Sequence, residues 1–152
     1  KAFATGYYLP STLKEKIDVV VVIDTSGSIG QKEYSEFAGE ICGMAKAFKD
    51  RIDMKLIMHD AIVQSVLDVK NGNIEKIKKM KLKGGGGTEF NCVAKHINEK
   101  MKGTKVVVWL TDGCASKITE KTNYPIIWVI SEGGTDEYIK DRKGDKIIML
   151  KE

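Results

Sequence analysis

Apolar residues fall into two alternating patterns along the 152-residue chain. Runs rich in Val, Ile and aromatic residues, each bounded by turn residues, predict strands at residues 17–23, 52–58, 61–69, 105–110, 125–130 and 146–150. Between them, apolar residues recur every three or four positions and predict helices at 31–49, 73–80 and 90–101. This alternation predicts an α/β, Rossmann-like, doubly wound fold.

The link between the second and third strands predicts how one edge of the sheet is built. Only His59 and Asp60 separate 52–58 from 61–69, which is too short for a parallel crossover and therefore predicts an antiparallel hairpin. The sheet is then mostly parallel, with one antiparallel edge strand. On the helix at 31–49, the spacing predicts an inward stripe of Tyr34, Phe37, Ala38, Ile41, Met44, Ala45 and Phe48.

Oxygen-bearing side chains directly follow two of the strands. The run VVVVIDTSGS ends its apolar part at Asp24 and continues to Ser26 and Ser28, and KVVVWLTDG places Asp112 after the fourth strand. The glycine-rich GGGGTEF adds Thr88, which is also a candidate N-cap for the following helix. Ligands bind at the carboxyl ends of parallel strands, and hard divalent cations prefer oxygen donors. The three loops therefore predict a metal site.

These motifs resemble a von Willebrand factor A (VWA) domain with a metal-ion-dependent adhesion site (MIDAS). DTSGS at 24–28 matches the DxSxS motif, Thr88 the second-loop threonine and Asp112 the third-loop aspartate, over about residues 17–150. The resemblance implies a six-stranded sheet in the order 3-2-1-4-5-6 with helices on both faces. The first and fourth strands, which end in Asp24 and Asp112, would then flank the topological switch point.

A narrower likeness comes from LPS near the start, the GGT loop, LTDG and YPIIWVI. Together they resemble the VWA-like module that follows a metallopeptidase-like domain in some bacterial and phage proteins. Where such modules read GGTD, this chain has Glu89, which either acts at the metal through water or faces solvent at a helix N-terminus, where an acid is favoured. Residues 1–16 are then an N-terminal arm or linker remnant, and 17–152 the VWA-like domain.

The resemblance implies a non-catalytic, metal-dependent protein-interaction module. With neutral hydroxyls from Ser26, Ser28 and Thr88, and with Asp24 and Asp112 acting partly through water, the cation would attract an Asp or Glu carboxylate of a partner. Mg²⁺ is the expected ion, and Mn²⁺ or Ca²⁺ could substitute. Family partners include AAA+ ATPases and upstream metallopeptidase domains. The alternatives are a metal-dependent phosphatase- or hydrolase-like enzyme, and a scaffold without metal-dependent binding.

Composition excludes several other classes of function. The formal charge is +4, but the five lysines between 76 and 83 lack interleaved aromatics, which favours a solvated helix face over nucleic-acid binding. We find no apolar stretch near the roughly 20 residues needed to span a membrane. Three cysteines without CxxC spacing argue against a disulfide framework and favour a cytoplasmic location. The motifs GxGxxG, GxxxxGK[ST] and HExxH are absent from the sequence.

A few single residues remain outside these patterns. His59 at the predicted hairpin turn and His96 on the flank of its helix are expected to be solvated or locally bonded. Cys92 falls in the first turn of a helix, where the dipole could lower its thiol pKa, although small-residue packing is the simpler interpretation. Trp109 and Trp128 lie inside predicted strands and are expected in the core.

Overall fold

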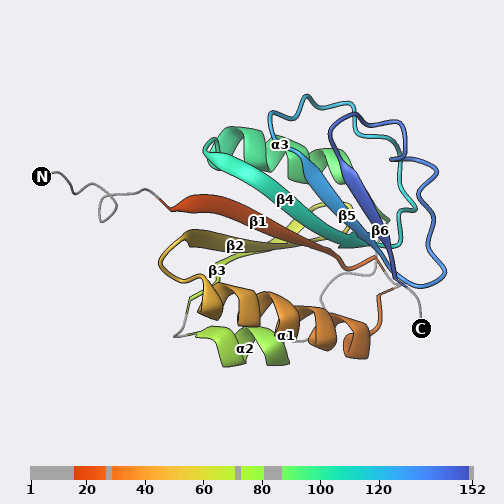
Figure 1. Ribbon diagram of the computed structural model, residues 1–152. Helices are drawn as coiled ribbons and strands as arrows, with labels where there is room; N and C mark the ends of the chain where they lie inside the picture. The colour runs from red at the N-terminus through yellow and green to blue at the C-terminus, as the bar shows by residue number, and fades with distance from the viewer. Residues whose placement is uncertain (1–15, 27–28, 71–72, 81–86, 151–152) are drawn as a thin grey trace, which may run out of the picture.

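The computed structural model describes residues 16–26, 29–70, 73–80 and 87–150. Its six strands form one sheet in the order β3-β2-β1-β4-β5-β6, as expected (Figure 1). Only the β2–β3 pair is antiparallel. The strands are β1 (Ile17–Asp24), β2 (Ile52–His59), β3 (Val63–Asp68), β4 (Thr104–Thr111), β5 (Ile126–Ile130) and β6 (Lys146–Met149). The predicted fold class is therefore confirmed.

Helices cover the two faces of the sheet (Figure 1). Helices α1 (Gln31–Ala47) and α2 (Ile74–Lys79) lie on one face, and α3 (Phe90–Lys100) lies on the other. Alternate residues of β1 enter two separate cores, with Val21 packed on the α1 side and Val22 on the α3 side. Burial on both faces explains why β1 is a continuous apolar run.

The inward face of α1 differs from the predicted stripe. Tyr34 is fully buried and its hydroxyl donates to the carbonyl of Ile77 in α2 at 2.7 Å. Cys42, on the same flank, is also buried, whereas Met44 and Phe48 are 45% and 46% exposed. The prediction that Met44 and Phe48 are core residues is wrong, because α1 packs against α2 as well as the sheet and buries one side of its apolar stripe.

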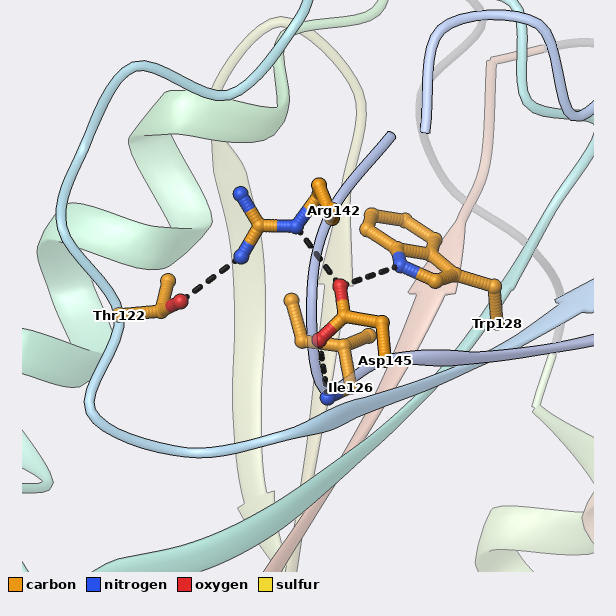
Figure 2. A network of polar contacts seen from close by, with 5 residues as sticks. All are labelled: Thr122, Ile126, Trp128, Arg142 and Asp145. Carbon is orange, nitrogen blue, oxygen red and sulfur yellow. Dashed lines mark hydrogen bonds and ion pairs between the residues drawn. The ribbon is translucent and has the colours of Figure 1, made fainter. Parts of the chain in front are cut away.

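The two connections around β5 consist of turns and extended segments. Residues 112–125 and 131–145, all within the described chain, contain no helix. A polar network fixes them at the N-terminal end of β5 (Figure 2). Asp145 accepts hydrogen bonds from Ile126 N at 3.0 Å, Trp128 Nε1 at 3.0 Å and Arg142 Nε at 2.7 Å. Arg142 Nη2 donates to Thr122 Oγ1 at 2.7 Å, so one carboxylate joins both connections to the sheet.

Aromatic side chains fill the core on the α3 side. Trp109 and Trp128 are fully buried and stacked with ring centroids 4.8 Å apart, and Phe90 lies 5.0 Å from Trp109. The expectation that both tryptophans are core residues is confirmed. Among the helices of the described residues, none is long and apolar enough to cross a membrane.

Candidate metal centre

Asp24 occupies the carboxyl end of β1, where its carboxylate is oriented by two segments of the chain. The residue is 1% exposed. Its Oδ1 accepts hydrogen bonds from the backbone N–H of Ser26 at 2.9 Å and from the Ser26 hydroxyl. Its Oδ2 accepts from Thr111 Oγ1 at 2.6 Å, and Thr111 Oγ1 accepts in turn from Gly113 N at 3.0 Å. These bonds join the ends of β1 and β4.

The serines of the DxSxS motif are only partly described. Ser26 is half-buried, and because its hydroxyl proton points at Asp24, its oxygen lone pairs remain suited to a cation. Gly27 and Ser28 lie outside the described residues. Thr25 turns away from Asp24, since its backbone N–H and its Oγ1 donate to the carbonyl of His59 at 2.7 and 3.0 Å.

Thr88 precedes α3 and is half-buried. It is not the N-cap of the helix, as the sequence suggested, because Glu89 takes that position and its carboxylate accepts from Asn91 N at 2.8 Å. Glu89 is therefore a capping residue, and the Thr88 hydroxyl is not used for capping. The backbone N–H of Glu89 donates to the carbonyl of Asp60 at 3.1 Å, which attaches this loop to the end of β2.

Asp112 directly follows β4 and is half-buried. Its Oδ1 accepts from Cys114 N at 2.9 Å, and its carbonyl accepts from Thr135 N at 2.8 Å. Since β1 and β4 are neighbouring parallel strands, Asp24 and Asp112 lie at the same edge of the sheet. The described residues contain no group of three or more His, Cys, Asp and Glu side chains that could hold a metal. The candidate site differs from such a group because hydroxyls make up most of it.

His59 was missed by the sequence reasoning. It is the last residue of β2, pairs in register with Asp24 and is fully buried, so of the two expected environments, solvated or locally bonded, the solvated one is wrong. Its Nε2 accepts from Trp109 Nε1 at 3.0 Å; because the indole can only donate, Nδ1 carries the proton and donates to the carbonyl of Asp60 at 3.0 Å. Burial lowers the pKa of His59, although nearby Asp24 opposes this.

Burial and nearby carboxylates make the thiols of Cys92 and Cys114 less acidic. Burial raises the pKa of Cys92, and Glu89 raises it further, so the helix dipole does not lower it, and Cys92 packs against the core on the α3 side. The pKa of Cys114 is also raised, first by burial and then by Asp112. In both cases a nearby carboxylate disfavours the thiolate. Cys42, Cys92 and Cys114 are all free thiols.

Comparison with known proteins gives relatives in sequence and in fold. An uncharacterized protein of Thermotoga maritima is 26% identical over 137 residues, or 90% of this chain and 32% of that protein. The chain therefore spans about a third of that relative's length. Proximal thread matrix protein 1 from the mussel byssus has a similar fold, with a TM-score of 0.65 and 13% identity over 88% of this chain and 41% of that one.

The fold also matches a solved structure named for its VWA domain. The SpRpn10 VWA domain superposes with a TM-score of 0.53 and 12% identity, covering 90% of this chain and 88% of that one. The family model described as VWA-like domain (DUF2201) matches residues 19–139, which is most of the chain. The chain therefore belongs to the VWA-like domain family.

Proposed function

We propose that this domain binds a protein partner through a divalent cation held by Asp24, Ser26, Ser28, Thr88 and Asp112. VWA-like domains generally mediate protein–protein interaction and are typically non-catalytic. The observation that carries the proposal is the Asp24 carboxylate, which is buried and oriented by donors from the loop after β1 and from the last residue of β4. Any catalysis is assigned to the rest of a larger protein or to the partner.

The donor set fits a hard cation such as Mg²⁺, with Mn²⁺ or Ca²⁺ as substitutes. Both oxygens of Asp24 already accept hydrogen bonds, so Asp24 suits a role through a bound water more than direct ligation. Ser26 and Thr88 offer neutral hydroxyl oxygens. A site with so little negative charge in direct contact leaves a cation able to take a carboxylate from a partner's Asp or Glu.

The larger protein supplies the context for this module. The chain spans about a third of its Thermotoga relative, so the other two thirds of a protein of that length can hold the partner. We propose an AAA+ ATPase or an upstream metallopeptidase domain as the partner class. The three free thiols fit a reducing, cytoplasmic compartment.

A metal-independent scaffold is the second candidate function. Its support is that Ser26 and Thr111 satisfy both Asp24 oxygens without a cation. Under this alternative, partner binding persists in EDTA. A phosphatase-like reaction lacks comparable support, because Ser26 stands where such an enzyme needs a second acid.

Calorimetry with Mg²⁺ tests the metal site. Wild type is expected to bind one ion, and Asp24→Asn is expected to lose most of the heat, since it removes the charge with little change of shape. Asp18→Asn is the matched control, because Asp18 is an exposed residue near the opposite end of the same strand. Equal heats for wild type and Asp24→Asn would refute the assignment.

Binding of an acidic ligand tests the partner chemistry separately. A labelled peptide with one Glu is expected to raise fluorescence polarisation in Mg²⁺ and to be released by EDTA. The same peptide with Gln in place of Glu is the control. Binding of the Glu peptide that is unchanged by EDTA would favour the scaffold, and equal binding of both peptides would refute carboxylate recognition.

A further inference from the structure

We infer that His59 is a positioning residue that fixes, relative to one another, the three segments that carry the proposed metal ligands. This role rests on the function proposed above. The hydrogen bonds of the His59 imidazole go to Asp60 and Trp109, which are not proposed ligands, yet the bonds of its side chain and carbonyl lead to each of the three segments that carry one. It is fully buried at the end of β2, beside Asp24 on β1.

The first segment is the loop after β1. The His59 carbonyl accepts both the backbone N–H and the hydroxyl of Thr25, at 2.7 and 3.0 Å. Thr25 lies between Asp24 and Ser26, so its two bonds fix the point at which this loop leaves the sheet. Its side chain is thereby kept on the side away from the Asp24–Ser26 contact.

The second segment is the loop that carries Thr88. His59 Nδ1 donates to the carbonyl of Asp60 at 3.0 Å, and the same carbonyl accepts from Glu89 N at 3.1 Å. The Asp60 carboxylate is itself fixed by Ile62 N at 3.1 Å. The imidazole therefore orients the Asp60 carbonyl, which accepts the hydrogen bond from Glu89, the residue after Thr88.

The third segment is the end of β4. Trp109 Nε1 donates to His59 Nε2 at 3.0 Å, and Trp109 lies two residues before Thr111, whose hydroxyl bonds to Asp24. Edge contacts fix the imidazole plane, with ring centroids 5.3 Å from Trp109 and 6.2 Å from Phe90. The side chain needs one donor and one acceptor on a rigid ring, which neutral histidine supplies.

Magnesium affinity is the first readout. His59→Phe keeps a ring but removes both polar bonds, and we expect it to bind Mg²⁺ about 10- to 100-fold more weakly, as for other residues that orient ligands. His59→Asn, which can still donate to the Asp60 carbonyl, is expected to recover part of the loss. His96→Phe changes the other histidine, on α3, and is expected to retain wild-type affinity. Equal affinity for His59→Phe and wild type would overturn the role.

Hydrogen exchange of the two indole protons tests the wild-type chain directly. If the Trp109–His59 bond favours Mg²⁺ binding, then Mg²⁺ must favour that bond in return. Addition of Mg²⁺ is therefore expected to slow exchange at Trp109 Nε1 more than at Trp128 Nε1, which bonds to Asp145. Equal slowing would indicate general stabilisation only and would overturn the role of His59.

Different results would refute the metal site and the positioning role of His59. If wild type gives no heat with Mg²⁺ and neither indole changes, the metal site itself is refuted. If wild type binds Mg²⁺ but His59→Phe binds equally well, or the two indoles respond alike, only the positioning role is refuted.

Discussion

Asp145→Ala is expected to destabilise the domain severely, although the residue lies far from the candidate site. Its side chain is 4% exposed and accepts hydrogen bonds from Ile126 N, Trp128 Nε1 and Arg142 Nε (Figure 2). Alanine offers no acceptor to any of these donors. The helix-free connections on either side of β5 would lose the carboxylate that joins them.

The loss of stability follows from the three donors that would no longer have an acceptor. A buried donor without a partner costs about 1–3 kcal/mol. Arg142 is 21% exposed and keeps its bond to Thr122, so its share is at the low end. Ile126 N and the indole of the buried Trp128 have less access to water. With about 1 kcal/mol for Arg142 and about 1–3 kcal/mol for each of the other two donors, the sum is about 3–7 kcal/mol, a large part of the roughly 5–15 kcal/mol typical of a folded domain.

Urea unfolding followed by far-ultraviolet circular dichroism measures this cost without relying on the fluorescence of Trp128. Asp141→Ala is the matched control, because Asp141 is in the same connection but is 75% exposed and pairs with Lys117 at 3.7 Å. Its free energy of unfolding should stay within about 0.5 kcal/mol of wild type. If Asp145→Ala costs no more than Asp141→Ala, the network of Figure 2 does not stabilise the fold as described.

Two further predictions concern backbone geometry and pH. Gly113→Ala should lower the free energy of unfolding in urea by more than about 2 kcal/mol, because φ is +81° and the new Cβ would lie 1.8 Å from the Thr135 carbonyl oxygen. Gly133→Ala is the control and should lower it less, because Gly133 has the same φ but open space around the new Cβ. Burial raises the pKa of Tyr34 to about 12. The stabilising contribution of the neutral phenol is therefore complete below pH 10 and is lost as pH rises toward 12. In Tyr34→Phe, the free energy of unfolding should depend less on pH in that range.

Much of the fold could be predicted because burial on both faces leaves a direct mark on sequence. The runs that became β1 and β4 are continuous, and the short link after β2 allowed only a hairpin, although the turn itself falls at residues 60–62. The prediction for the inward stripe of α1 was less accurate, since Met44 and Phe48 are exposed. Periodicity places Met44 and Phe48 near the core-facing side, but only the position of α2 decides which side of the stripe is buried.

The candidate site could be predicted only where its proposed ligands coincide with strand ends. Asp24 and Asp112 follow strands that sequence already placed, and the structure puts those strands side by side. His59 gave no such signal, because its burial depends on Trp109, which is 50 residues away in sequence. Glu89 as the N-cap was likewise decided by local geometry, in competition with Thr88.

Diffraction from crystals grown with Mn²⁺, recorded near the manganese absorption edge, tests the metal site most directly. We expect one anomalous peak at the carboxyl ends of β1 and β4, within about 2–2.5 Å of the hydroxyl oxygens of Ser26 and Thr88, and its loss in crystals of Asp24→Asn. Well-ordered crystals with Mn²⁺ in the solvent but no peak at this edge, or a peak that persists in Asp24→Asn, would contradict the metal site and leave a VWA-like scaffold.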